Sequence, residues 1–252
     1  MITSPDRLSA GELLELRAFD TPTLHNGWEQ ITRADPAREG FNLEPLTDWM
    51  PNLGTIIGYA VTLVIEPGNP AHAKNSRAWP DYRRYVGSIP GPKIVVVQDL
   101  DKPRTYGSVW GEVQANIHHQ LGCAGAIVDG GVRDIPQMQA VGFKALARRL
   151  CVGHAHGTPV RWGCDVEVFG TPVRPGQLVA ADRHGFLVVP REDEAELLAA
   201  VQFMEKLERH TKIAAARSGH ECTTAELLDR LDAANREFKA QALARFKRAG
   251  EG

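Results

Sequence analysis

The stretch Ala126-Ile-Val-Asp-Gly-Gly-Val-Arg-Asp134 predicts a buried strand that ends in a polar turn. Its apolar start is typical of an interior strand, and a double glycine lets the backbone approach a ligand closely and adopt a positive φ. The Arg133 guanidinium binds carboxylates in a fork, and the Asp134 carboxylate suits a hard cation. An anion binder beside a metal binder at the carboxyl end of a strand is where α/β proteins carry their chemistry.

A purely structural interpretation of the same residues stays open. Asp134 could be the N-cap of a helix that begins at Ile135, with Pro136 tolerated in its first turn. Arg133 could form a surface ion pair that contributes little stability. The stretch therefore needs a partner element before it indicates a functional site.

The loop Tyr106–Gly111 and the helix expected after it supply such an element. The first amides of a helix lack partners within the helix, and together with the helix dipole they form an anion site. Arg133, on the next strand-to-helix turn, can reach the same anion, and Glu112 would add a second carboxylate near Asp134. The amides that a bound carboxylate would contact are those of Gly111, Glu112, Val113 and Gln114.

Alternating strand and helix signals predict an α/β core that is followed by a helical extension. Strands are expected over 55–66, 93–99, 126–129, 146–152, 166–168, 178–181 and 185–189. Helices are expected after the capping box at Ser9, after the turn 20–23, over 112–121, from Ile135, over 192–218 and over 224–249. The segment 67–92 is expected to be a long loop. We divide the chain into a core domain, 1–190, and C-terminal helices, 191–252, that pack on the core or on a neighbouring subunit.

Composition and charge argue against several classes of protein. The 252 residues include 29 Lys and Arg and 31 Asp and Glu, so the net charge of −2 does not favour a nucleic-acid surface. The longest apolar run, 56–65, is about half as long as a membrane-spanning helix. We see no secretory signal, and the four cysteines show no zinc spacing. We expect a cytoplasmic protein that binds neither nucleic acid nor membranes.

The motifs around these turns resemble those of the RraA-like family. That family includes class II pyruvate aldolases that cleave 4-hydroxy-4-methyl-2-oxoglutarate, and the regulator of RNase E activity. The resemblance covers roughly residues 45–215. The matching motifs are Gly111-Glu112, Gly122-x-x-Gly125-x-x-Val128-Asp129-Gly130-x-x-Arg133-Asp134, Gly58-Tyr-Ala-Val-Thr62, Pro175-Gly-Gln-Leu-Val-Ala-Ala-Asp182 and Gly185-Phe-Leu-Val-Val-Pro190.

The resemblance implies a fold and a set of site roles. The fold is a swivelling α/β/β-type sandwich that assembles as a homotrimer or a homohexamer, with active sites at subunit interfaces. Asp134 would hold a divalent ion, Mg²⁺ or Mn²⁺, and Arg133 would contact substrate. The amides of 111–114 would receive the carboxylate of a 2-oxo acid, and Glu112 would work through water bound to the ion. The glutamate that completes the site from the neighbouring subunit's C-terminal helix is best matched by Glu208, with Glu205 as the alternative.

The activity implied by the resemblance is that of a metal-dependent lyase. It would cleave a 4-hydroxy-2-oxo acid, such as 4-hydroxy-4-methyl-2-oxoglutarate, to pyruvate and a second carbonyl compound, with oxaloacetate decarboxylation as a side activity. Two alternatives stay open: a non-catalytic protein-binding regulator of RNase E type, and a lyase or hydratase for another 2-oxo acid. The expanded segment 67–92 and the long final helix depart from the family pattern, so they leave the acyl side of the substrate undefined.

Three further features have competing interpretations. His154-Ala-His156 has a spacing found in metal sites, but two histidines without an adjacent carboxylate are more often structural. Trp110 either walls the acyl end of the pocket or belongs to the core. No lysine is expected in an apolar strand interior except Lys93, which stands at the start of a strand, so we do not favour a Schiff-base aldolase.

Overall fold

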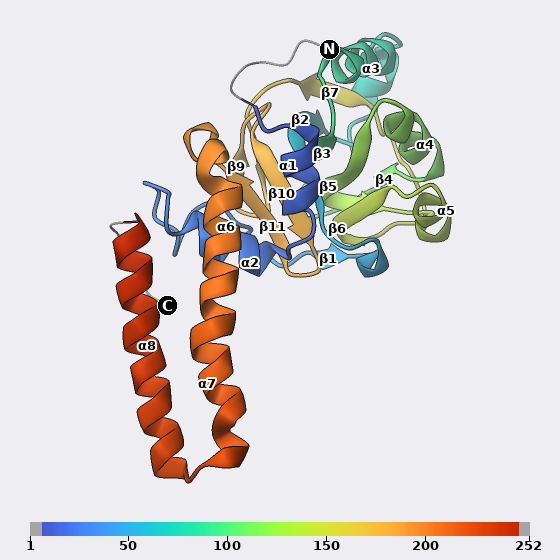
Figure 1. The fold of residues 1–252 in the computed structure, drawn as a ribbon. Coiled ribbons are helices and arrows are strands. Elements are labelled where there is room, and N and C mark those ends of the chain that lie inside the picture. Colours follow the sequence, from blue (N-terminus) through green and yellow to red (C-terminus); the bar gives the residue numbers. More distant parts are fainter. Residues whose placement is uncertain (1–6, 247–252) are drawn as a thin grey trace.

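A mixed β-sheet curls around an apolar interior in the computed structural model, which describes residues 7–246 (Figure 1). The strand order is β1-β6-β5-β3-β2-β10-β11, with β4 beside β5 and β7 beside β2. The bounds are β1 Thr47–Asp48, β2 Ile56–Ile65, β3 Lys93–Asp99, β4 Ser108–Trp110, β5 Cys123–Val132, β6 Lys144–Leu150, β7 Pro159–Trp162, β10 Leu178–Asp182 and β11 Gly185–Val189. A separate ribbon is made of β8 (Val166–Val168) and β9 (Thr171–Val173).

The centre of the sheet is parallel, and this direction places the functional turns at one edge. β2, β3, β5 and β6 run parallel, while β1, β7, β10 and β11 join antiparallel to their neighbours. Parallel neighbours need crossover connections, which here contain α3 (Ala78–Ser88), α4 (Glu112–Gln120) and α5 (Ile135–Ala140). The carboxyl ends of β3 and β5 therefore lie side by side, with β4 next to β5.

Alternation along the central strands separates an inner from an outer apolar layer. Ala60 and Val64 of β2 face inward, where the β8–β9 ribbon and strands β10 and β11 close the interior around them. Val61 and Leu63 of the same strand face outward and pack beneath α3, α4 and α5. The sheet is thus a nearly closed barrel with helices on its outside.

Helices α1 (Ala10–Leu16), α2 (Thr21–Trp28) and α6 (Glu194–Glu208) cover a different part of the outside, over β10 and β11. After α6 the chain forms a π-helical turn (Arg209–Ile213), the short helix α7 (Ala214–Arg217) and then α8 (Thr224–Phe246). Single turns of 3-10 helix occur at Pro51–Leu53, Pro70–Lys74, Arg191–Asp193 and Ser218–Glu221. Figure 1 shows α7 and α8 as an arm that projects from the body, with α8 running back alongside α6. Met204 and Leu207 of α6 form a small apolar seam with Phe238 of α8.

The predicted α/β sandwich with a C-terminal helical extension is confirmed. The loop predicted over 67–92 is wrong in its second half, because α3 buries Ala78, Tyr82 and Val86 on one face. The helix predicted over 192–218 is interrupted by the π-helical turn, and the last helix is observed to Phe246, so 247–249 lie outside the described residues. Strands β1, β4, β7 and β9 were not expected. The domain boundary at 190 stays a prediction.

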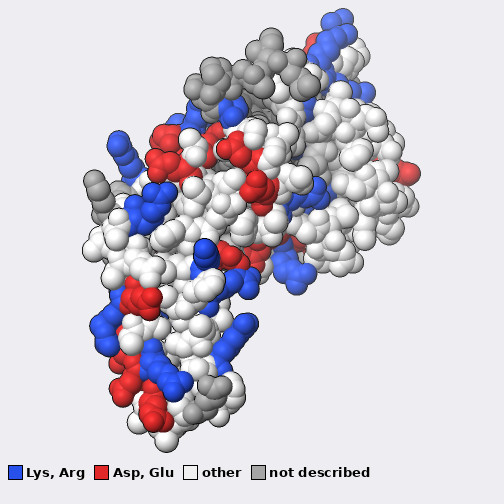
Figure 2. Space-filling model, in the orientation of Figure 1, with Lys and Arg blue, Asp and Glu red and all other residues white. Residues whose placement is uncertain are grey.

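Two surface properties bear on partners. No helix among residues 7–246 is both long enough and apolar enough to cross a membrane. Figure 2 shows Lys and Arg interspersed with Asp and Glu along the arm on the face displayed, without a continuous basic field there.

Candidate active site

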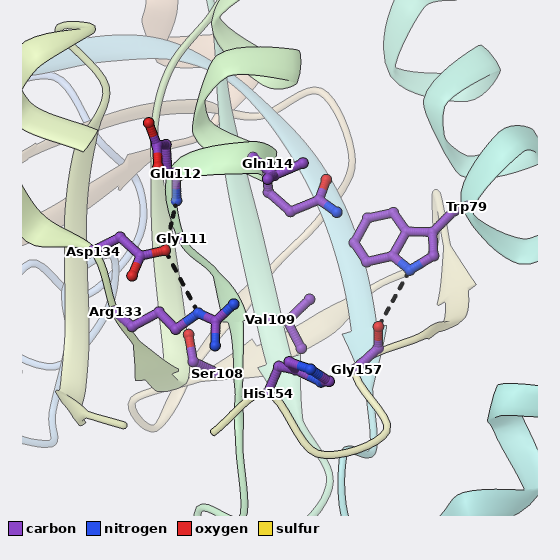
Figure 3. Close-up of a pocket in the computed structure, with 11 residues that line it drawn as sticks. Trp79, Ser108, Val109, Gly111, Glu112, Gln114, Arg133, Asp134, His154 and Gly157 are labelled. Carbon is purple, nitrogen blue, oxygen red and sulfur yellow. Dashed lines mark hydrogen bonds and ion pairs between the residues drawn. The ribbon is translucent and has the colours of Figure 1, made fainter. Parts of the chain in front are cut away.

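A hollow of about 200 Å³ lies where α4 begins beside the carboxyl end of β5 (Figure 3). We call it the candidate site. Segments far apart in the sequence line it: strand β4, the first turn of α4, the turn after β5, the start of α3 and the loop before β7. The lining residues are Trp79, Ser108, Val109, Gly111, Glu112, Val113, Gln114, Arg133, Asp134, His154 and Gly157. The predicted anion-binding turn and the predicted metal-binding turn thus share one hollow.

Asp134 contacts the helix of the neighbouring turn instead of its own helix. It precedes α5 in a left-handed conformation (φ 56°, ψ 40°), and its side chain makes no capping bond to α5. Its Oδ2 accepts a hydrogen bond of 3.0 Å from the amide of Glu112, at the start of α4. A left-handed non-glycine residue is strained, and such strain is concentrated at functional sites. The ordinary N-cap interpretation therefore does not describe this side chain.

Position 111 accepts only glycine, because neighbouring side chains occupy the space that a Cβ atom would need. Its φ of −159° is extended backbone that other residues adopt, but a Cβ atom there would lie 2.4 Å from Oδ2 of Asp134. It would also approach the Arg133 side chain, with Cγ at 3.1 Å. The pairing of Gly111-Glu112 with Arg133-Asp134 in the sequence thus has a steric cause, because the first pair leaves room for the second.

Arg133 is held at its backbone and partly free at its guanidinium. Its amide donates to the carbonyl of Trp110 at 3.0 Å, which ties the end of β5 to β4. Its Nη1 donates to the carbonyl of Val152 at 3.3 Å, and its Nε lies 3.5 Å from Oδ2 of Asp134. The side chain is 37% exposed, so the remaining N–H groups are available to an anion in the candidate site.

The first turn of α4 offers backbone donors to the same hollow. Helix geometry leaves the amides of its first turn without internal partners. The amide of Glu112 is occupied by Asp134, so those of Val113 and Gln114 are the donors left for a ligand. Beneath this turn His118 is buried, and its Nδ1 bonds to the carbonyl of Gln114 at 2.7 Å. Burial lowers the pKa of His118 to about 4, so the ring is neutral and structural.

The far wall of the candidate site differs from the expectation. Trp110 is completely buried and packs against His118, with ring centroids 4.8 Å apart, so it belongs to the core. Trp79 of α3 lines the hollow instead, with Val109, His154 and Gly157. The only signal for Trp79 in the sequence was the density of aromatic residues in the segment 67–92. His156 is exposed and does not line the hollow. No group of three His, Cys, Asp or Glu residues within 7–246 is placed to form a metal cage.

The two C-terminal glutamates lie elsewhere in the subunit. Glu205 and Glu208 line a separate hollow between the end of α6 and the α1–α2 turn, together with Asp20, Arg209 and Arg217. Glu205 pairs with Arg209. Since α6 and α4 lie on opposite sides of the molecule (Figure 1), neither glutamate reaches the candidate site of its own chain. A contribution from a neighbouring subunit stays a prediction.

The double glycine of the opening stretch is explained by packing within the chain. Gly130 and Gly131 lie inside β5 without positive φ. A Cβ at Gly130 would lie 2.7 Å from Oδ2 of Asp99, and a Cβ at Gly131 would lie 2.5 Å from Sγ of Cys151. The expectation that they bring the backbone close to a ligand is therefore wrong. They make room for neighbouring strands.

Asp129, five residues before Asp134, has a full set of partners. It is completely buried. Lys102 lies 2.5 Å from its Oδ2, the amide of Phe169 donates to the same oxygen at 2.9 Å, and Nε of Arg148 donates to Oδ1. Arg148 also bonds to Glu44, so the cluster is a network of alternating charge that runs from the buried Asp129 to the partly exposed Glu44. It has no free coordination position and no connection to the candidate site.

Comparisons with known proteins agree with these motifs. The sequence model of the family described as RraA-like: Aldolase/RraA matches residues 21–188. Protein DlpA of Legionella pneumophila is 23% identical over 177 residues, which are 69% of this chain and 27% of DlpA. A protein of Halalkalibacterium halodurans named "Putative 4-hydroxy-4-methyl-2-oxoglutarate aldolase" is 30% identical over 110 residues, 43% of this chain and 51% of that protein. The matched regions thus span about a quarter and about half of these relatives.

A solved structure shares the fold. It is that of Streptomyces coelicolor RraAS2, described as an unusual member of the RNase ES inhibitor RraA protein family. It aligns with a TM-score of 0.64 and 22% identity, over 81% of this chain and 96% of that chain. At this identity the likeness concerns the fold.

Proposed function

This chain belongs to the RraA-like family, and from that membership and the geometry of the candidate site we propose that it is a divalent-metal-dependent pyruvate aldolase. The enzyme cleaves a 4-hydroxy-2-oxo acid to pyruvate and a second carbonyl compound, and it decarboxylates oxaloacetate as a side reaction. The observation that carries this proposal is the meeting of three groups in one hollow: the Arg133 guanidinium, the Asp134 carboxylate and the first amides of α4. A pure binding protein has no need of this combination.

The carboxylates present fit a hard divalent ion. Mg²⁺ keeps several waters and takes only one or two protein carboxylates, often with oxygens of the substrate. Within the described chain, the contacts of Asp134 are made through Oδ2, so Oδ1 is left for an ion. Glu112 is exposed at the same hollow and can hold water beside it. A bound Mg²⁺ or Mn²⁺ would supply Lewis-acid polarisation of the 2-oxo group.

The protein's own groups account for the rest of the chemistry. The amides of Val113 and Gln114 bind the substrate carboxylate, and Arg133 donates to the 2-oxo oxygen, on which negative charge develops. Glu112 accepts the proton of the C4 hydroxyl through water. The C4–O bond then becomes a carbonyl, the C3–C4 bond breaks, and its electron pair forms the pyruvate enolate, which takes up a proton at C3. Loss of carbon dioxide from oxaloacetate leaves the same enolate.

The site is completed by a neighbouring subunit in this proposal. Glu208, with Glu205 as the alternative, comes from the C-terminal helix of the next chain in a homotrimer or homohexamer. The location of both residues in a hollow of about 580 Å³ at the surface of α6 is compatible with such an interface. Size-exclusion chromatography with light scattering tests the assembly.

Deuterium exchange at the methyl group of pyruvate, followed by NMR, tests the enolate chemistry without any assumption about the leaving group. We expect exchange and oxaloacetate decarboxylation in the presence of Mg²⁺ or Mn²⁺, and loss of both in EDTA. Arg133→Lys removes the planar fork and should lower both rates about 100-fold. Arg174→Lys, at an exposed arginine 75% accessible, should match wild type. Full activity in EDTA would refute the metal dependence, whereas no exchange under any condition would refute the aldolase proposal and favour a binding role.

A further inference from the structure

The far wall of the candidate site is built by α3, the helix in the segment that departs from the family pattern. Trp79, in the first turn of α3, presents its indole toward Val109 and the Gln114 side chain across the hollow (Figure 3). Its ring is partly buried, and its inner edge meets Tyr82 at 5.9 Å between centroids. The edge of the indole therefore closes the hollow on the side opposite Arg133 and Asp134 (Figure 3).

This wall is fixed before any substrate arrives. Nε1 of Trp79 donates to the carbonyl of Gly157 at 3.2 Å, which joins α3 to the loop before β7. That loop is closely packed on β4, since a Cβ at Gly157 would lie 3.1 Å from Cγ2 of Val109. Tyr82, one turn further along α3, is fully buried and anchors the helix in the outer core. A rigid aromatic surface of this kind binds a planar group at low entropic cost.

The charges of the candidate site are distributed unevenly. Among the described lining residues, Arg133 is the one Arg or Lys, and it lies at the α4 end with Asp134. The guanidinium of Arg83 lies 5.3 Å from the Trp79 ring but does not line the hollow. The 2-oxo acid end of a substrate thus has a fixed cation, and the opposite end faces Trp79, Val109 and Gly157. A second carboxylate there would have no fixed positive partner among the lining residues of this chain.

We propose that Trp79 determines which group the substrate carries at C4, an inference that rests on the proposed function. Substrates with a flat, uncharged group at C4, such as an aryl ring, are preferred over substrates with a second carboxylate there. The ring of the bound substrate packs against the indole before the C3–C4 bond breaks, and the aldehyde or ketone released with pyruvate is neutral. Trp79 touches the substrate but not the reacting bond, so it determines specificity.

A competition between two substrates tests this selection. We expect kcat/KM for 4-hydroxy-2-oxo-4-phenylbutanoate to exceed that for 4-hydroxy-4-methyl-2-oxoglutarate at least about tenfold in wild type. Trp79→Ala should lower this ratio about tenfold, and Trp79→Phe should retain most of it because phenylalanine keeps an aromatic face. The thermal unfolding midpoints of both variants establish that they are folded.

The outcomes separate this inference from the proposed function. Pyruvate deuterium exchange by wild type, together with a ratio that favours the phenyl substrate and falls in Trp79→Ala, supports both. Exchange together with a preference for the dicarboxylate, or with a ratio that Trp79→Ala leaves unchanged, overturns the selection by Trp79 and leaves the aldolase proposal standing. Absence of exchange and of pyruvate release from either substrate overturns both.

Discussion

Asp129 and Asp134 stand five residues apart on one strand and its turn, yet their surroundings are opposite. Asp129 is completely buried and has Lys102, Arg148 and a backbone amide around its two oxygens. Asp134 is one-third exposed and uses one oxygen for the amide of Glu112. A carboxylate whose coordination is complete holds strands together, whereas one with a free oxygen in a hollow can serve chemistry.

The cost of losing each carboxylate follows from this difference. A buried charge pair is strongly destabilised when one partner is removed, because the other charge is left desolvated and unpaired. An exposed carboxylate has little such penalty, so its removal is felt mainly in binding and turnover. The two residues therefore allow activity and stability to be separated within one short stretch.

The largest expected effect is on activity, in Asp134→Asn. Asparagine tolerates the left-handed backbone and keeps an oxygen that can accept from the amide of Glu112, so the fold should persist. The variant loses the anionic oxygen proposed to hold the ion. We expect oxaloacetate decarboxylation to fall about a thousandfold, because Lewis-acid stabilisation contributes several kcal/mol, while the urea midpoint stays near that of wild type. Retention of more than about a tenth of the wild-type rate would remove Asp134 from the site.

The next effect is on stability, in Asp129→Asn. Lys102 and Arg148 would lose their shared anion while their side chains stay only 25% and 26% exposed. We expect the free energy of unfolding in urea to fall by about 3 kcal/mol. Asp165→Asn is the matched control, because Asp165 is 73% exposed and lies 3.7 Å from Arg174. If Asp129→Asn unfolds at the urea concentration of this control, the contrast between the two aspartates is lost.

Local sequence patterns correctly predicted segments whose structure depends on interactions between residues close in the sequence. Lys93–Asp99 was predicted as a buried strand and is β3 with the same bounds. The predicted capping box at Ser9 and the predicted turn 20–23 each begin a helix, where Ser9 bonds to Glu12 and Asp20 bonds to Thr23. These features are encoded within a few residues, so tertiary packing did not change them.

Features set by packing between distant segments were not predictable in this way. The sequence pattern does not indicate where a tryptophan side chain points. Trp110 faces the core, whereas Trp79 faces the hollow. The bond from Asp134 to α4 depends on the register of β4 on β5, which no local signal specifies. Trp79 was missed because Pro80 and the surrounding polar residues obscure the helical spacing of Ala78, Tyr82 and Val86.

Asp99 sharpens the comparison, because it is buried like Asp129 but lacks a bonded cation. It is 1% exposed, its Oδ1 accepts from the amide of Asp101 at 3.0 Å, and its Oδ2 is buried without a hydrogen-bond partner. Burial chiefly, with the charges of Asp101 and Asp129, raises the pKa of Asp99 to about 7. An unfolded aspartate has a pKa of about 3.9. Between these two values the folded protein keeps a proton that the unfolded chain has released.

The smallest expected effect therefore depends on pH and appears in Asp99→Asn. The free energy of unfolding of wild type falls as pH rises from about 4 to about 7, since the folded state binds more protons, and this contribution is constant above that range. Asparagine is neutral throughout, so the variant should gain about 2 kcal/mol relative to wild type between pH 5 and pH 8 in urea unfolding. Asp165→Asn should parallel wild type. If the stability of Asp99→Asn has the same pH dependence as that of wild type, the cations around Asp129 already stabilise the charged form of Asp99. Asp99 and Asp129 would then belong to one shared charge network, and the contrast between a paired and an unpaired carboxylate would be lost.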